Sequence, residues 1–299
     1  MHNEIALVLA GQELPGSLFP AVYVPRFVHG QSQGICDLFG VHVERQEDNN
    51  YFVYPLTPEP GQVDHIEIRK IDEGMYWNAV KWIEYAHTAT RGCFEFRNPV
   101  MTSPFDTANY LLGTTVLMEW VYTEPAALHR LLGKITDLII SMVNALRKAA
   151  GGTLHGEGVW CVRNAFTLCS ECRSLVSAET FEEFEAPYLT RIGQQLGCYG
   201  IHSCGSWERT IPVSLKDSNL RVMNGQVREN DLAFLCELAK GEIILSIGQS
   251  QNLDERYTWT DRKSFFEYII KTVPAKQPLE ICIDESELEL WNEIYKTRS

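Results

Sequence analysis

Residues 123–151, TEPAALHRLLGKITDLIISMVNALRKAAG, form the most regular stretch of the sequence. The stretch opens with Thr123 as a capping hydroxyl and Pro125 in the first turn, and Gly151 follows its end. Between these signals, apolar side chains recur at steps of three and one, the spacing of one buried helix face. They are Leu128, Leu131, Leu132, Ile135, Leu138, Ile139, Met142, Val143 and Leu146. The pattern predicts a long helix packed against a core on one side.

Short apolar runs alternate with helical patterns after this helix. The runs that predict strands lie at 153–160, 198–203, 220–223, 242–247 and 279–283. The helical patterns lie at 177–197, after 205, and at 230–240, 261–271 and 285–296. A strand followed by a helix, repeated along half the chain, indicates a parallel sheet covered by helices.

The first half of the chain is less regular. Its predicted elements are a hairpin of 41–45 and 51–54, a helix at 72–86, a strand at 93–96 and a helix at 104–112. No low-complexity linker divides the chain. We therefore expect a single α/β domain over residues 1–299, a (β/α)₈ TIM barrel with an N-terminal elaboration. Residues 1–70 would form the irregular part with the hairpin, and 71–299 the strand–helix repeats. A doubly wound open sheet is the alternative.

The composition excludes several classes of protein. The chain holds 26 Lys and Arg against 39 Asp and Glu, a formal net charge of −13, so a nucleic-acid binder is not expected. No run of about 18 apolar residues occurs, which predicts no membrane span. Residues 1–4 lack the basic start of a secretion signal, so we expect a cytoplasmic protein. In that reducing compartment the nine cysteines are expected to be buried, redox-active or metal-binding.

His202 and Cys204 form the sharpest candidate site. They are two residues apart at the end of a predicted strand, so their side chains project from the same face. Cys282 lies near the end of the last predicted strand, and active sites of barrels lie at this end of the strands. One imidazole and two thiolates suit Zn²⁺ and leave a fourth tetrahedral position open. The alternative is a hydrogen-bonded core histidine with two buried cysteines.

Several segments, in a fixed order along the chain, resemble the uroporphyrinogen decarboxylase superfamily. They are SPFDTA at 103–108 with LLG at 111–113, TEP at 123–125, the segment 177–188 with its two phenylalanines and Pro-Tyr end, and NLD at 252–254. Members of this superfamily are TIM barrels, and they include zinc-dependent, corrinoid-linked methyltransferases.

The resemblance implies a metal centre and a reaction. Methyltransferases of the superfamily bind zinc through His-x-Cys and a distant Cys, positions that His202, Cys204 and Cys282 occupy here. Zinc would activate a small-molecule thiol toward a methyl group carried on a corrinoid protein. Glu157 is the candidate carboxylate for the fourth position, although its flanking glycines also fit an exposed loop. Trp207 is a candidate wall of the substrate site, or a side chain packed under the next helix.

Two other functions remain open. The decarboxylases of the superfamily use no metal and bind a carboxylated tetrapyrrole through an Arg-rich N-terminal segment. Here residues 22–29 offer only Arg26, and Cys282 lies where a histidine-bearing loop would close the barrel. A non-catalytic barrel that binds a corrinoid or a substrate is the third alternative.

The remaining motifs predict little chemistry. Cys169 and Cys172 have C-x-x-C spacing, which fits a redox pair or two incidental loop cysteines. The chain has no P-loop and no Gly-x-Gly-x-x-Gly after a strand, so no nucleotide cofactor is predicted.

Overall fold

The computed structural model describes residues 21–22, 24, 26–56, 58–156, 165–227, 229–248, 259, 261–281 and 285–296. Its strands are β1 (Ala21–Val22), β2 (Val43–Arg45), β3 (Tyr51–Val53), β4 (Glu95–Arg97), β5 (Leu154–His155), β6 (Phe166–Cys169), β7 (Tyr199–Ser203), β8 (Leu220–Gln226), β9 (Ile244–Gly248) and β10 (Leu279–Ile281). β2 and β3 form the predicted antiparallel hairpin.

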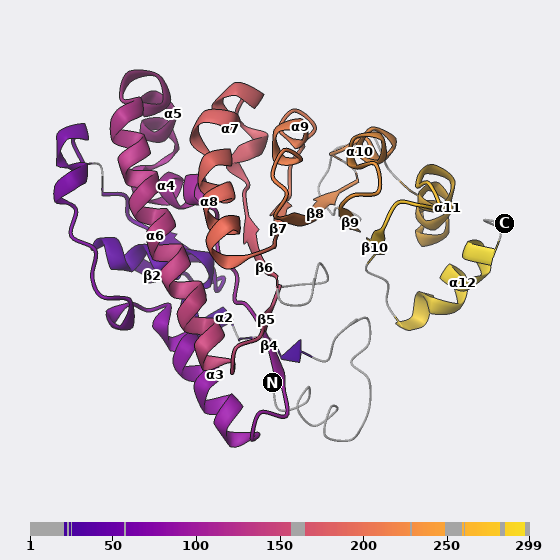
Figure 1. The fold of residues 1–299 in the computed structure, drawn as a ribbon, viewed down its shortest axis with the longest axis horizontal. Helices are drawn as coiled ribbons and strands as arrows, with labels where there is room; N and C mark the ends of the chain where they lie inside the picture. Colours follow the sequence, from indigo (N-terminus) through magenta and orange to yellow (C-terminus); the bar gives the residue numbers. More distant parts are fainter. Residues whose placement is uncertain are drawn as a thin grey trace.

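The other strands form two parallel sheets. One contains β1, β4 and β5, with β4 in the middle, and the other contains β6 to β10 in chain order. Figure 1 shows β6 to β10 side by side, with α7, α9 and α10 above them. An isolated parallel bridge between Thr102 and Cys169 joins the segment after β4 to β6. Among the described residues, no ladder pairs β10 with β1.

This strand order decides between the two predicted architectures. A doubly wound sheet reverses its strand order at a switch point, whereas a barrel adds each new strand beside the previous one. β6 to β10 follow one another without reversal. The arrangement is therefore that of a barrel wall.

The helices are α2 (Arg26–His29), α3 (Trp77–Ala89), α4 (Pro104–Leu112), α5 (Thr114–Thr123), α6 (Pro125–Ala149), α7 (Ala178–Phe184), α8 (Ala186–Leu196), α9 (Ile211–Ser214), α10 (Leu232–Ala239), α11 (Arg262–Thr272) and α12 (Leu288–Lys296). Short 3₁₀ helices cover Gln31–Phe39, Pro60–His65, Ile71–Glu73, Cys172–Ser174 and Glu285–Glu287. None of the described helices is both long and apolar enough to cross a membrane.

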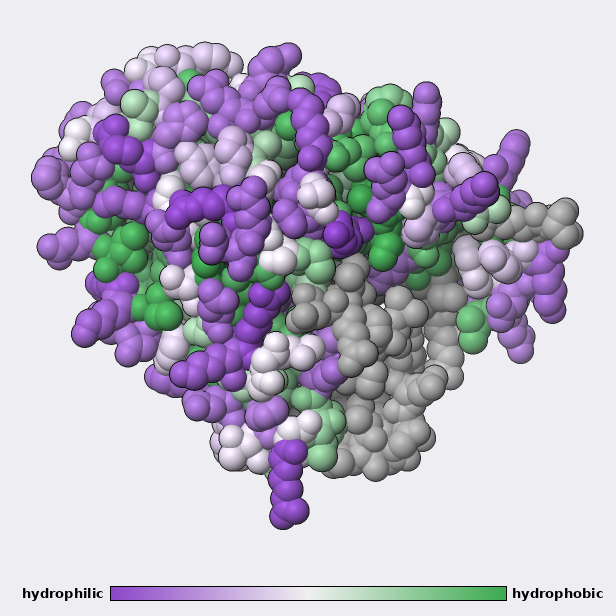
Figure 2. Space-filling view, in the orientation of Figure 1, coloured by the Kyte–Doolittle hydropathy of each residue, from purple (hydrophilic) through white to green (hydrophobic). Residues whose placement is uncertain are grey.

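The long helix α6 confirms the periodicity argument. All nine apolar residues predicted for its inner face are buried, and the helix packs against α3, α4 and α8. The predicted cap was wrong, because Thr123 ends α5 and its hydroxyl donates to the Glu119 carbonyl at 3.0 Å. Figure 2 shows that hydrophilic side chains cover most of one face of the described molecule.

Three other predicted helices differ in length. The helix expected from residue 72 begins at Trp77, after a separate 3₁₀ turn. The helix expected over 177–197 is two helices that meet at Glu185, because Pro187 has no N–H to continue the hydrogen bonding of α7. The helix expected after residue 205 is the single turn α9.

Candidate metal centre

His202, Cys204 and Glu171 meet at the carboxyl ends of β6 and β7. His202 is near the end of β7, Cys204 directly follows that strand, and Glu171 lies two residues beyond β6. The Nε2 atom of His202 is 3.1 Å from the Cys204 Sγ atom and 3.3 Å from the Glu171 Oε1 atom. The three side chains each offer one ligand atom within 4.8 Å of the others. His202 and Cys204 were predicted as site residues from the sequence, and Glu171 was not.

Asn224 and Ser246 fix the orientation of the His202 ring. The Asn224 side-chain nitrogen donates to the carbonyl and hydroxyl oxygens of Ser246 at 3.1 and 3.0 Å. The Asn224 amide oxygen therefore faces His202, where it accepts a hydrogen bond from Nδ1–H. With its proton on Nδ1, a neutral imidazole presents the lone pair of Nε2 toward Cys204 and Glu171.

These partners belong to one row across the sheet. The register pairs Cys169 with His202, His202 with Asn224, and Asn224 with Ser246. The bridge from Thr102 to Cys169 extends the row by one more strand segment. Four neighbouring strands thus bring polar or thiol side chains to the same level.

Two hydrogen bonds hold the Glu171 carboxylate in place. Its Oε2 atom accepts the backbone N–H of Cys204 at 2.7 Å and the Ser203 hydroxyl at 3.4 Å. Its Oε1 atom faces His202. One carboxylate oxygen is thus bonded to the Cys204 backbone, and the other is directed at the imidazole.

The charges of the cluster favour a positive charge between His202, Cys204 and Glu171, either a proton or a metal ion. Burial by itself lowers the pKa of His202, but hydrogen bonds to Cys204 and Glu171 raise it to about 10. Burial by itself raises the pKa of Glu171, but His202 and the Cys204 amide hold it below its usual value. The cluster therefore stabilises one positive charge at the His202 Nε2 position, and a bound metal ion would replace that proton.

The donor set fits a zinc ion. Zn²⁺ binds imidazole nitrogen, thiolate sulfur and carboxylate oxygen, and these three donors converge here. Histidines that bind metals nearly always donate their other ring N–H to a fixed acceptor, which Asn224 provides for His202. The chemistry of the site and its supporting contacts both match the group.

Two predicted site residues, Glu157 and Cys282, lie outside the described residues. Their roles remain predictions. Glu171 gave a usable signal in the sequence, since it is an acidic residue shortly after the run Phe-Thr-Leu-Cys at 166–169. The C-x-x-C motif in that region was the only feature predicted there, and strand β6 was not predicted.

Trp207 is 2% exposed, and its ring packs against Gly225 of β8. A Cβ atom at Gly225 would overlap its indole ring, and the Arg173 guanidinium lies 5.7 Å from the ring centroid. Successive residues of β8 face opposite sides, so Gly225 faces away from the side on which Asn224 holds His202. A contact between Trp207 and substrate stays a prediction.

The C-x-x-C motif forms the end of β6 and the turn that carries Glu171. Neither Cys169 nor Cys172 forms a disulfide, and Cys172 is buried. Burial and the nearby Asp106 carboxylate raise the pKa of the Cys172 thiol far above its usual value. The thiolate needed for redox exchange is therefore strongly disfavoured at Cys172.

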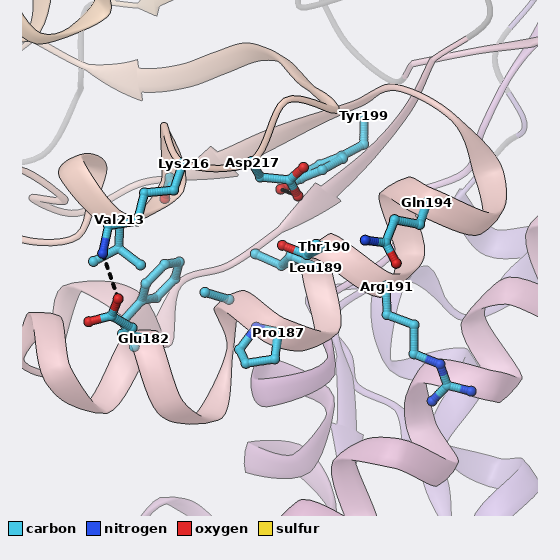
Figure 3. A pocket seen from close by; sticks show the side chains of 13 residues that line it. Glu182, Pro187, Leu189, Thr190, Arg191, Gln194, Tyr199, Val213, Lys216 and Asp217 are labelled. Atoms are coloured by element: carbon cyan, nitrogen blue, oxygen red, sulfur yellow. Dashed lines mark hydrogen bonds and ion pairs between the residues drawn. The ribbon is translucent and has the colours of Figure 1, made fainter.

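A separate groove of about 430 Å³ lies on the outer wall, between α7 and α8 on one side and α9 on the other. Figure 3 shows Pro187, Leu189 and Val213 facing it, and an ion pair between Glu182 and Lys216 at its edge. The groove exists because α9 is one turn long and covers little of the sheet. None of the three clustered donors lines it.

Comparison with protein families gives one match to a large part of the chain. Residues 35–226 match the uroporphyrinogen decarboxylase (URO-D) family. This range includes the motifs at 103–113 and 177–188, and it includes Glu171, His202 and Cys204. The resemblance predicted from those motifs is confirmed.

Two kinds of relatives match shorter parts of the chain. The methylated-thiol–coenzyme M methyltransferase of Methanosarcina mazei is 28% identical over 150 residues, which are 47% of this chain and 38% of the relative. The uroporphyrinogen decarboxylase of Xanthomonas campestris is 31% identical over 94 residues, 31% of this chain and 22% of the relative. The matched regions thus span well under half the length of either relative.

A solved structure shows the same fold. A methyltransferase from Methanosarcina mazei aligns with 97% of this chain and 82% of its own, with a TM-score of 0.66 and 13% sequence identity. Together with the strand order, this alignment confirms the predicted α/β barrel fold.

Proposed function

Because the chain belongs to the uroporphyrinogen decarboxylase family, we propose that it is a zinc-dependent methyltransferase of that family. The reaction would move a methyl group between a corrinoid and a thiol. The observation that carries the proposal is the convergence of Glu171, His202 and Cys204 at the carboxyl end of two barrel strands. Members of the barrel fold place their chemistry at this end.

The proposal gives each residue a role. His202 Nε2 and Cys204 Sγ would be two zinc ligands, with Cys282 as the further thiolate expected from sequence. Glu171 would occupy the fourth position, the role predicted from the sequence for Glu157, because its Oε1 atom faces the His202 Nε2 atom. Asn224 would keep the His202 ring in the orientation that binds metal.

Bound zinc would lower the pKa of a coordinated thiol and so provide a thiolate nucleophile at neutral pH. The thiol would displace the Glu171 Oε1 atom from the fourth position, and the released carboxylate would then accept the proton of the thiol. The thiolate sulfur would supply the electron pair of the new S–C bond, and the electron pair of the broken Co–C bond would stay on the corrinoid, so that the charges balance.

The relatives support this reaction class. The name of the Methanosarcina relative describes a methyltransferase that acts on methylated thiols and coenzyme M, and its alignment is the longer of the two described above. We propose a small-molecule thiol and a corrinoid protein as partners of this chain. We place the reaction in the cytoplasm, as expected from the sequence.

Metal analysis of protein purified without chelator tests the proposal. We expect about one zinc per chain, and loss of that zinc in Cys204→Ser. Cys93→Ser is the matched control, because Cys93 is also an exposed free thiol but lies outside the cluster. A folded wild-type protein that contains no zinc and takes up none would overturn the proposal.

Decarboxylation is the second candidate, supported by the 31% identity to the Xanthomonas decarboxylase. That reaction needs no metal in this family, so decarboxylase activity that survives Cys204→Ser would favour it. Zinc binding without turnover of any thiol and methyl-corrinoid pair would instead favour a binding barrel that has lost its chemistry.

A further inference from the structure

Asp106 is a buried carboxylate in the first turn of α4, and its partners lie on a different element. The residue is 3% exposed. The Oδ2 atom accepts the backbone N–H of Glu171 at 2.6 Å, and the Oδ1 atom accepts the backbone N–H of Cys172 at 2.8 Å. Each carboxylate oxygen thus binds one of two consecutive amides in the turn after β6.

These amides are the ones that a turn leaves without partners. Glu171 is the residue that precedes the 3₁₀ turn Cys172–Ser174, the position at which a side chain usually caps the free N–H groups. Glu171 makes no such cap. Asp106 caps the turn from α4 instead, which leaves the Glu171 carboxylate available to bind the Cys204 N–H and face His202.

A second buried carboxylate holds the neighbouring residue. Glu185 accepts the Ser170 hydroxyl at 3.1 Å through Oε1 and the Phe105 N–H at 2.9 Å through Oε2. The start of α4 and the turn after β6 are therefore joined at two points. Of these two carboxylates, Asp106 is the one that binds the Glu171 backbone N–H.

We infer that Asp106 is a positioning residue that sets the Glu171 carboxylate beside His202 and Cys204. The inference rests on the proposed role of Glu171 as a metal ligand, but its structural part does not require a metal. Asp106 acts on the site through the backbone of Glu171, by fixing the direction in which that side chain leaves the turn.

Two nearly isosteric variants separate this role from general stability. In Asp106→Asn, the side-chain NH₂ group faces one of the two backbone N–H groups, so one bond is lost and two donors oppose each other. In Glu185→Gln, the NH₂ group can donate to Ser170, whose hydroxyl rotates to accept, while the oxygen still binds the Phe105 N–H. Both variants remove one buried carboxylate from the same region, but only the first disturbs Glu171.

Hydrogen exchange on the metal-free protein gives the first readout. We expect Asp106→Asn to lose protection at the Cys204 amide, which Glu171 binds, whereas Glu185→Gln keeps it. Unchanged protection in a folded Asp106→Asn protein would overturn the inference. If that variant does not fold, hydrogen exchange in the wild-type protein provides the test. We expect the amides of Glu171, Cys172 and Cys204 to exchange with the same free energy of opening. Different free energies would overturn the inference.

Zinc affinity gives the second readout, in a double-mutant cycle. We expect Asp106→Asn to weaken zinc binding about 10- to 100-fold, as loss of outer contacts typically does. In a Glu171→Gln background the same substitution should have little further effect, because its target is already gone. An equal loss in both backgrounds would show a general structural role and overturn the inference. If the wild type binds no zinc but Asp106→Asn exposes the Cys204 amide, the zinc proposal fails and the positioning role stands.

Discussion

The Asn224 amide oxygen on β8 accepts a hydrogen bond from the His202 Nδ1 atom on β7, and the two residues are direct register partners. The sheet itself therefore sets the rotation of the imidazole. Because Ser246 on β9 holds the other end of the Asn224 side chain, that amide cannot turn over without losing two hydrogen bonds. The ring nitrogen that faces Cys204 is thus determined by three neighbouring strands.

Replacement of Asn224 should weaken metal binding without removing a ligand. We expect Asn224→Leu to lower zinc affinity about 10- to 100-fold, because the His202 ring loses its fixed acceptor. Asn224→Asp should retain most of the affinity, since a carboxylate accepts the same bond. Competition with a chromophoric chelator measures both. Equal affinities for Asn224→Leu and the wild type would contradict the expectation.

The proposed thiolates can be counted with cobalt in place of zinc. We expect sulfur-to-cobalt charge-transfer absorption in the wild type, weaker absorption in Cys204→Ser and Cys282→Ser, and none in the double variant. Cys93→Ser should leave the spectrum unchanged. A Cys282→Ser spectrum identical to that of the wild type would remove Cys282 from the proposed ligand set.

Gly225→Ala should destabilise the barrel. A Cβ atom at this position overlaps the buried Trp207 ring, and overpacking of this kind costs about 1–3 kcal/mol. Gly133→Ala in α6 is the control, since a Cβ there meets nothing within 4 Å and alanine favours the helix by about 1 kcal/mol. Thermal midpoints should therefore move in opposite directions. A Gly225→Ala midpoint at or above that of the wild type would mean that the Trp207 ring can shift without loss of stability.

Glu185 should make stability fall as the pH rises. Burial and the neighbouring Asp106 raise the pKa of Glu185 from 4.5 to about 7. Between these values the unfolded chain releases the proton and the folded chain keeps it, so the folded state loses stability as pH increases through this window. Below pH 4.5 this effect is absent, because both states are protonated.

The matched variant Glu185→Gln isolates that effect. Its stability relative to the wild type, measured by denaturant unfolding of metal-free protein, should increase from pH 5 to pH 7.5. Titrating groups that do not interact with Glu185 cancel in the difference, and the change in the pKa of its neighbour Asp106 acts in the same direction. Parallel stability curves for the two proteins would show that Glu185 titrates normally in the folded state.

The sequence was sufficient for the parts of the fold that depend on local periodicity. Helix α6 and strand β7 were predicted nearly to their ends, since the spacing of apolar residues alone defines them. The break between α7 and α8 was not predicted, although Pro187 indicates the start of a new helix. The Thr-x-Pro pattern at residue 123 does not reveal that a preceding helix, α5, ends at Thr123 and uses its hydroxyl.

The site was predicted only in part for a different reason. His202 and Cys204 are two residues apart at the end of one strand, so the alternation of side chains brings them together. Glu171 and Asn224 reach His202 from neighbouring strands, and their contact depends on strand register, which one sequence does not determine. Asp106 depends on a meeting of α4 with the turn after β6, which no local pattern encodes.

The polar row of Thr102, Cys169, His202, Asn224 and Ser246 also restricts how this chain can change in length. An inserted or deleted residue within β6, β7, β8 or β9 shifts every later residue of that strand to the opposite face, which would turn one member of the row away from its neighbours. The same change in a connection on the outer wall, such as the one-turn segment α9, leaves the row intact. We therefore expect insertions and deletions among homologous chains to lie in the connections, whereas the number of residues in each of the four strands stays the same.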